Sequence, residues 1–396
     1  MPKLRFSKFS QEWSKLRLGD YVQNFQKKVS SDTDIPVYSS SRQGLKPQAE
    51  YFADRELQND GEYGVVPYGY ITYRHMSDDN TFHFNLNDKL PEIAVSKEYP
   101  VFKGKGLNNY FLISKLNHTN EFKEFAIQQK SGGTRTRLYF KKLCDWYATF
   151  PTLEEQIKIA DFLSSVDESI TILNNQLDLM CKYKKGMMQK VFSQELRFKD
   201  DDERHFPKWT FKKLGEVATF LKGKGVAKSD ISDLGEHECI RYGELYTHYN
   251  EVIKKIKSRT NQVLMGSILS SARDVLIPSS GESVLDISKA SCVLMSNVIL
   301  GGDLNIIRSK LIDGVFLSYY INSQKKYEIA KMAQGNSVVH LYAKQLSKMD
   351  VSYPCLKEQT KIANFLSAID DKITTKKAEL DKLETWKQGL LQQMFV

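Results

Sequence analysis

Several short segments of the sequence place arginine or lysine beside glycine, asparagine, glutamine or serine. Arg42 and Gln43 lie in "YSSSRQGLK", and Arg135 and Arg137 follow two glycines in "SGGTRTRLYF". Positive side chains bind phosphate oxygens, whereas arginine, glutamine and asparagine match the hydrogen-bonding edges of bases. The net charge of +9 also favours a polyanionic partner, although weakly. These residue types indicate binding rather than catalysis.

Candidate contacts of this kind occur in both halves of the chain. In the first half they are Arg42, Gln43, Arg74, His75, Lys103, Lys105, Arg135 and Arg137. In the second half they are Lys222, Lys224, Arg241, Tyr242, Tyr246, Asn336, Ser337, His340 and Lys344. A surface lysine or arginine is often simply solvated, and Arg74 and Arg241 are alternatively structural ion-pair partners. Tyr139 and Tyr342 are expected in the core; alternatively, they stack on a base.

The sequence lacks the common catalytic motifs. No G-x-x-x-x-G-K-[ST] phosphate loop is present, and "GKGVAKS" from Gly223 has no glycine before Lys228. There is no Asn/Asp-Pro-Pro-aromatic motif of an amino-methyltransferase, and no convincing cluster of nuclease carboxylates or zinc ligands. We therefore predict no catalytic residue and no metal site in this chain.

The composition predicts a folded protein of two or three domains. The chain has 396 residues, of which 41% are hydrophobic, and it contains no apolar run of membrane-spanning length. Its N-terminus is charged and does not resemble a signal peptide. The five cysteines have no disulfide or zinc spacing, so we expect reduced, buried thiols in a cytosolic protein.

The chain contains a long internal repeat. The segment "PTLEEQIKIADFLSSVDESIT" from Pro151 returns as "PCLKEQTKIANFLSAIDDKIT" from Pro354, 203 residues later. The match extends back to Gly132 and Gly335, and a Trp followed by Leu-Gly opens each copy, at Trp13 and at Trp209. Between these signposts, the two intervening regions share little sequence: residues 22–131 and 218–334. This pattern predicts one common architecture that carries two different heads.

Each copy of the repeat predicts a long helix with an apolar stripe. Apolar residues recur in alternating steps of three and four, which is typical of a coiled coil. The stripe comprises Leu163, Val166, Ile170, Leu173, Leu177 and Met180 in the first copy, and Leu366, Ile369, Ile373, Leu380, Leu383 and Leu390 in the second. Lys184, Lys376 and Lys387 interrupt it. We expect the two helices to pack on each other antiparallel; alternatively, each packs on its own neighbouring domain.

The repeated P-x-L-x-E-Q-x-K-I-A-x-F-L-S-x-x-D, the Trp…Leu-Gly openings and the two-copy layout resemble the specificity subunits of type I restriction–modification systems. The resemblance covers essentially the whole chain. It implies an α+β fold with a pseudo-twofold internal repeat, in which an antiparallel coiled coil of two long helices separates two α/β target recognition domains. The implied parts are a first recognition domain at 1–150, a first helix at 151–193, a charged linker at 194–209, a second recognition domain at 210–353 and a second helix at 354–396.

The resemblance also implies a function. Each recognition domain would read one half of a bipartite, asymmetric DNA target, with the candidate contacts as the DNA-binding residues. The paired helices would set the spacer and dock two modification subunits that carry S-adenosylmethionine. Restriction subunits would add a motor and nuclease that use ATP and Mg²⁺, so the chain itself would bind no cofactor, have no activity of its own and work in the bacterial cytoplasm. Glu155, Gln156, Glu358 and Gln359 are candidates for modification-subunit docking or, alternatively, for helix starts. A different reading of the whole chain is a coiled-coil scaffold that bridges two proteins without reading DNA.

Overall fold

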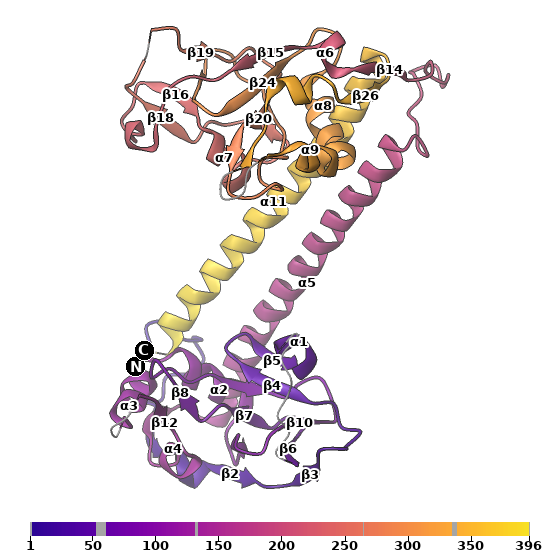
Figure 1. Ribbon diagram of the computed structural model, residues 1–396. Coiled ribbons are helices and arrows are strands. Elements are labelled where there is room, and N and C mark those ends of the chain that lie inside the picture. Colours follow the sequence, from indigo (N-terminus) through magenta and orange to yellow (C-terminus); the bar gives the residue numbers. More distant parts are fainter. Residues whose placement is uncertain (1, 53–60, 131–133, 264, 335–338, 396) are drawn as a thin grey trace. The chain divides into compact units, whose positions relative to one another are not determined.

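The computed structural model describes residues 2–52, 61–130, 134–263, 265–334 and 339–395. The chain divides into two compact units (Figure 1). Unit 1 comprises Met1–Asn174 and Ala378–Val396, and unit 2 comprises Asn175–Lys377. Two long helices, α5 (Leu153–Phe192) and α11 (Leu356–Met394), run through both units. Each unit therefore contains one globular part, the start of one long helix and the end of the other.

The globular part of unit 1 is built from short antiparallel strands. The paired strands, in their order within each sheet, are β1 (Ser14–Arg17) with β13 (Tyr147–Phe150); β10 (Glu92–Ser96), β6 (Glu62–Pro67) and β3 (Lys28–Ser30); β2 (Val22–Phe25), β11 (Val101–Gly104), β7 (Ile71–Tyr73) and β9 (Phe84–Leu86); β4 (Tyr38–Ser41) with β5 (Gly44–Pro47); and β8 (Met76–Ser77) with β12 (Thr136–Arg137). The helices are α1 (Gln48–Phe52), α2 (Asn109–His118), α3 (Asn120–Gln128) and α4 (Phe140–Leu143), with a 3-10 turn at Leu18–Tyr21. Strand residues together with Phe111 of α2 and Trp146 before β13 form a buried aromatic core that includes Tyr73, Phe84 and Phe102.

The globular part of unit 2 combines antiparallel and parallel pairs. Its sheets are β14 (Thr210–Lys213) with β26 (Asp350–Tyr353); β15 (Thr219–Lys222), β24 (Leu304–Arg308), β20 (Asp274–Pro278), β22 (Ser291–Val293) and β17 (Val252–Ile253); β18 (Ser258–Thr260), β16 (His237–Ile240), β23 (Ile299–Leu300) and β19 (Ile268–Leu269); and β21 (Ser280–Gly281) with β25 (Val339–His340). β16 with β23 and β17 with β22 are the parallel pairs between named strands of the described residues. The helical segments are α6 (Leu214–Val217), a 3-10 turn at Lys228–Asp230, α7 (Tyr242–Thr247), α8 (Gly314–Tyr320), a π-helical turn at Ile321–Lys325, α9 (Lys326–Met332) and α10 (Ala343–Leu346).

The long helices pair in opposite directions. In unit 1, Leu163 near the start of α5 and Leu390 near the end of α11 belong to one apolar cluster. In unit 2, Val191 at the end of α5 and Leu366 near the start of α11 share another cluster. The start of each helix therefore packs beside the end of its partner, so the predicted antiparallel arrangement and the predicted fold class are confirmed. Both clusters also contain residues of the adjacent globular part, so each helix half packs on its neighbouring domain as well.

The predicted stripe residues face inward to different degrees. Seven are buried: Leu163, Val166, Leu173, Leu366, Ile369, Leu380 and Leu390. The other five are partly buried: Ile170, Leu177, Met180, Ile373 and Leu383. Five of the seven buried residues belong to the apolar clusters that the helices share with the globular parts, whereas Leu173 and Leu380 lie outside these clusters.

The cysteines correct one expectation. All five are free, but only Cys239 and Cys292 are buried, whereas Cys181 and Cys355 are exposed and Cys144 is partly buried. Cys181 lies in α5, and Cys355 directly precedes α11. Among the residues that the structure describes, no helix is both long and apolar enough to cross a lipid bilayer.

Candidate nucleic-acid interface

Predicted contacts from separate segments of unit 1 surround one groove. The groove has a volume of about 280 Å³, and its lining includes Arg42 and Gln43 from the β4–β5 hairpin and Arg74 after β7. Asp78 also lines the groove and accepts a hydrogen bond from Nε of Arg135 at 2.7 Å. Three arginines that are far apart in the sequence are thus brought to the same rim.

The arginines at this rim are held differently. Arg42 donates to Oδ1 of Asp79 at 2.5 Å, and this bond, with further donors from Thr81 and Ser77, holds the pKa of Asp79 well below its usual range. Arg74 is exposed and has no ion pair or hydrogen bond within the described ranges. Exposed arginine–carboxylate pairs are weak, so Arg42 and Arg135 can exchange their carboxylates for phosphates.

His75 does not belong to this surface, which corrects the prediction for this residue. Only 4% of it is exposed, and its ring stacks on Tyr139 with the centroids 5.3 Å apart. Burial lowers the pKa of His75, so its imidazole is uncharged at neutral pH and cannot pair with a phosphate. Lys103 and Lys105 lie away from the groove lining; Lys103 is half-buried above the Tyr70 ring, and Lys105 is exposed.

The candidate DNA contacts of unit 2 also differ in exposure: some are exposed and others are partly buried. Lys222, Lys224, His340 and Lys344 are exposed, and Lys224 donates to the backbone oxygen of Met265 at 2.9 Å. Asn336 and Ser337 lie outside the described residues.

Three unit 2 candidates are partly buried. Arg241 pairs with buried Glu244 at 3.3 Å, which supports the alternative of a structural ion pair for this arginine. Tyr242 packs against an apolar cluster, and Tyr246 is also partly covered. Partial burial leaves these three side chains less surface for a ligand than the exposed lysines have.

A short two-stranded ribbon recurs in both units. In unit 1, β8 and β12 pair Met76 with Arg137, and in unit 2, β21 and β25 pair Ser280 with His340. Arg137 and His340 occupy matching positions of the internal repeat. The structure therefore gives the two most similar candidate segments the same local architecture.

The tyrosines that follow these ribbons correct a second expectation. Tyr139 and Tyr342 are 53% and 56% exposed, so their predicted core placement is wrong. The preceding residues, Leu138 and Leu341, are fully buried instead. Because successive side chains of an extended segment point to opposite faces, burial of the leucine turns the tyrosine outward.

The repeated Glu-Gln pairs at the helix starts are buried inside the protein. Glu155 is 1% exposed and accepts two hydrogen bonds from Arg5, at 2.6 and 2.7 Å. Glu358 is 0% exposed and accepts two from Arg197, at 3.1 and 2.6 Å. Each carboxylate thus forms a bidentate ion pair with a guanidinium group, and this geometry best offsets the free-energy cost of burying a charge.

The neighbouring glutamines connect each long helix to a helix of the globular part. Oε1 of Gln156 accepts from the backbone N–H of Asn108 at 3.0 Å, and Oε1 of Gln359 accepts from that of Asp313 at 2.6 Å. Asn108 and Asp313 are the N-caps of α2 and α8, and their side chains accept from the first turns of those helices.

These contacts decide between the two alternatives for the Glu-Gln pairs. Glu155, Gln156, Glu358 and Gln359 are all at most 2% exposed and fully engaged inside their own units. A side chain in that position has no surface to offer another protein. The structure therefore supports a role at the helix starts and contradicts modification-subunit docking by these four residues.

Two of the three lysines that interrupt the stripe form ion pairs with aspartates of the other long helix. Lys184 Nζ lies 2.7 Å from Asp370 and 2.9 Å from Glu251, and Lys387 forms the matching ion pair with Asp167. Burial lowers the pKa of Lys184, but the two carboxylates raise it more, so the net shift is upward. Because each lysine reaches the partner helix, the two pairs fix the register of α5 against α11.

Sequence reasoning missed Arg5 and Arg197, although the signal was present. The tripeptide Leu-Arg-Phe occurs at residues 4–6 and again at 196–198, ahead of the repeated Trp in each case. Phe6 packs edge-on against Phe162, and Phe198 against Phe365. Ten residues at the starts of the long helices and in the segments packed on them occur as five matched pairs, and we call these ten residues the frame. They are Arg5, Trp13, Glu155, Gln156 and Asp167 in unit 1, and Arg197, Trp209, Glu358, Gln359 and Asp370 in unit 2.

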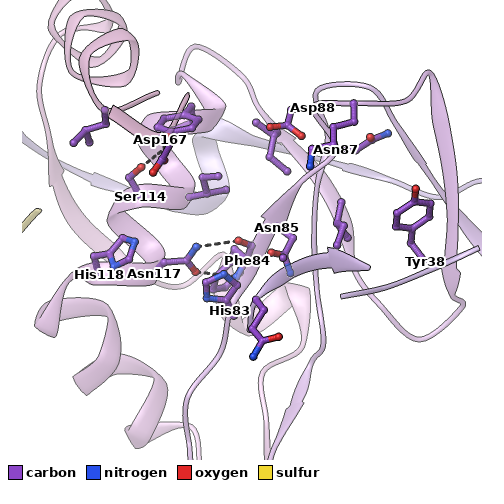
Figure 2. A pocket seen from close by; sticks show the side chains of 18 of the residues that line it. Tyr38, His83, Phe84, Asn85, Asn87, Asp88, Ser114, Asn117, His118 and Asp167 are labelled. Atoms are coloured by element: carbon purple, nitrogen blue, oxygen red, sulfur yellow. Dashed lines mark hydrogen bonds between the residues drawn. The ribbon is translucent and has the colours of Figure 1, made fainter. Parts of the chain in front are cut away.

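Several polar residues that line a larger pocket of unit 1 form hydrogen bonds within the protein. This pocket has a volume of about 380 Å³, and Figure 2 shows His83, Asn117, His118 and Asp167 around it. Asn117 exchanges hydrogen bonds with the backbone of Phe84 at 2.8 and 2.9 Å. Burial lowers the pKa of His118 to about 4. Among the described residues, no three potential metal ligands come together, here or elsewhere.

Comparison with known proteins gives the family. The model of the type I restriction modification DNA specificity domain matches twice, at residues 11–179 and 207–385. The MjaVIII specificity subunit of a type I restriction enzyme from Methanocaldococcus jannaschii is 26% identical over 431 residues, 96% of this chain and 91% of the relative. A second relative from that organism, MjaX, is 26% identical over 365 residues, 85% of this chain and 84% of the relative.

Solved structures agree on the fold. The S subunit of a type I restriction–modification system from M. genitalium has a TM-score of 0.64 at 15% identity and covers 100% of this chain and 99% of its own. The first match lies mainly in unit 1 and the second mainly in unit 2, which accounts for the internal repeat. The chain therefore belongs to the family of type I restriction–modification DNA specificity subunits, and it contains two recognition domains.

Proposed function

We propose that this chain is the DNA-reading subunit of a type I restriction–modification complex and that each unit reads one half of a bipartite, asymmetric target. The observation that carries the proposal is the duplicated frame, which holds two unlike globular parts by the same contacts. A protein with twofold symmetry reads two like half-sites. A single chain with a repeated frame and two different globular parts is suited to bind two unlike half-sites.

The groove of unit 1 supports DNA contact. Arg42, Arg74 and Arg135 lie at its rim, and arginine can bind both a phosphate and the O6 and N7 atoms of guanine. In unit 2, the exposed residues Lys222, Lys224, His340 and Lys344 fill the corresponding role in the proposal. Phosphate contacts of this kind would make DNA affinity fall steeply with salt, which distinguishes the proposal from a scaffold that bridges two proteins.

The paired helices are proposed to set the spacer between the two halves. The ion pairs Lys184–Asp370 and Lys387–Asp167 fix the register of α5 against α11, so the pair cannot slide without breaking both. A helix rises about 1.5 Å per residue, and DNA rises about 3.4 Å per base pair. One heptad added to both helices would thus correspond to up to about 3 base pairs.

The proposed partners are two modification subunits with S-adenosylmethionine and restriction subunits that use ATP and Mg²⁺, while this chain supplies no catalytic group. Exposed apolar residues recur at matching positions of the helices: Leu153 and Leu356 at the starts, and Tyr183 and Trp386 farther along. A repeated exposed surface supports binding of two copies of one partner. These residues replace the buried Glu-Gln pairs as the proposed docking surface.

Replacing Arg74 tests the proposed groove. In the complex with modification subunits, Arg74→Ala should lower affinity for the duplex that carries the methylated motif by roughly 5- to 150-fold, because one arginine–guanine contact contributes about 1–3 kcal/mol. Affinity can be measured by fluorescence anisotropy at fixed salt. Arg17→Ala is the control, since Arg17 is a partly exposed arginine of unit 1 that pairs with Asp145 and Asp20 outside the groove lining. Equal affinities of the two variants would contradict the groove as a DNA site.

A further inference from the structure

We infer that Tyr139 and Tyr342 are matched anchors for the sugar–phosphate backbone of DNA, which hold each recognition domain on the duplex regardless of the sequence being read. The inference rests on the proposed function and adds residues that the sequence patterns had placed in the core. It concerns a contact that the two units share, rather than one that distinguishes their targets.

The first argument is that both tyrosine rings are exposed and already restrained before a ligand binds. Each ring is more than half exposed, and each follows a leucine that is fully buried and fixes the backbone. Each ring also stacks on an imidazole: Tyr139 on His75 at 5.3 Å and 26°, and Tyr342 on His340 at 6.3 Å and 23°. Stacking restrains a side chain before it binds, which reduces the entropy lost on binding.

The second argument is the unused hydroxyl group. Within the described parts of the chain, neither phenol hydroxyl has a hydrogen-bond partner, whereas buried Tyr73 donates to the backbone oxygen of Leu138 at 2.9 Å. A tyrosine hydroxyl is one of the side-chain groups that donate to phosphate oxygens. The two exposed hydroxyls are therefore available to a phosphate.

The third argument is the charge beside each ring. Arg137 and His340 precede the tyrosines by two residues, so they lie on the same face of the extended segment. Lys141 and Lys344 follow by two residues and are exposed. Each tyrosine is therefore flanked by basic side chains, as a contact with an anionic backbone requires.

The fourth argument comes from the internal repeat. Tyr139 and Tyr342 belong to the short segments that match between the units, next to long regions that do not. A residue common to two domains that read unlike halves cannot supply the difference between those halves. Its ligand must be a feature present at both, and the sugar–phosphate backbone of DNA is such a feature.

The test is DNA binding by the complex with modification subunits, using Tyr139→Ala, Tyr342→Ala and the two conservative phenylalanine variants. Each alanine variant should lose about tenfold in affinity for the target duplex and also for an unrelated duplex of equal length, so the ratio of the two affinities stays constant. Phenylalanine should give a smaller loss of the same kind, because the ring remains and only the hydroxyl is removed. Matched controls are Tyr147→Ala in unit 1 and Tyr327→Ala in unit 2, both exposed tyrosines without a tyrosine partner in the repeat, which should bind as the parent does.

The possible outcomes separate the inference from the function on which it rests. Loss of affinity for the target duplex alone would assign the tyrosines to base readout and overturn the inference. Unchanged binding of both duplexes would overturn it as well, and failure of a folded alanine variant to assemble would show that the tyrosines contact a modification subunit instead. If the unaltered complex bound neither duplex, the proposed function itself would be wrong.

Discussion

A chain in which the region 22–131 is exchanged for that of another family member is expected to direct methylation to a motif with one new half and one old half. The exchange leaves Arg5, Trp13 and Glu155 of the frame in place and removes the groove with Arg42 and Arg74. Each mismatched base pair costs about 1–3 kcal/mol of binding, so a half-target of several bases is discriminated by roughly 10³-fold or more. Sequencing of methylated bases in cells that carry the modification subunit reads out the motif.

The structure also says what the exchanged region must contain. Gln156 bonds to the backbone of Asn108, and Trp13 packs against Phe111, so the replacement needs an equivalent helix start and an equivalent aromatic residue. Unit 2 already shows such a substitute, because Asp313 and Phe316 make the same contacts with Gln359 and Trp209. The reciprocal exchange of 218–334 should change only the other half. If either exchange altered both halves, the two units could not be independent readers.

Removing Arg5 is expected to destabilise unit 1 by about 3–5 kcal/mol, because Arg5→Ala leaves the buried carboxylate of Glu155 without its partner. Arg197→Ala should have the same effect on unit 2 through Glu358. Hydrogen-exchange protection of each unit's amides is the suitable measurement, since it reports the two units separately.

A neighbouring ion pair provides the control for this prediction. Lys8 pairs with Glu154, next to Glu155 in the sequence, but both side chains are exposed, so Lys8→Ala should cost less than about 1 kcal/mol. The double variant Arg5→Ala/Glu155→Leu should recover much of the lost stability, because an apolar residue carries no burial penalty for charge. If Arg5→Ala behaved like Lys8→Ala, the buried pairs would not hold the domains to the helices.

Features encoded by periodicity and by internal comparison could be predicted from the sequence. The stripe of Leu163, Val166 and their counterparts defined both long helices, and the repeat itself indicated that they pair antiparallel. These signals are local along the chain or are repeated within it, so no tertiary information is needed to detect them.

Features that depend on distant partners could not be predicted in the same way. Glu155 meets Arg5 across 150 positions of sequence, and the carboxylate's burial follows from that contact rather than from its neighbours. The faces of His75 and Tyr139 were assigned wrongly because a shift of one residue in an extended segment reverses which side chains are buried. Within the divergent regions, the repeat offered no second copy for comparison.

The proposed function requires that two DNA-reading domains are held at a fixed spacing. The most direct test is to sequence methylated bases in cells that express the chain or an insertion variant. The variant has seven residues added to each long helix, beside Leu177 in α5 and beside Lys377 in α11. Both sites lie 7 residues from the Lys184–Asp370 pair and 10 residues from the Lys387–Asp167 pair, so equal insertions keep both pairs. The unaltered chain should produce one motif of two unlike halves around an unspecified spacer, absent without the chain, and the variant should keep both halves with a spacer longer by up to about 3 base pairs. A motif that is continuous, that persists without the chain, or whose spacer does not respond to the insertion would contradict the account.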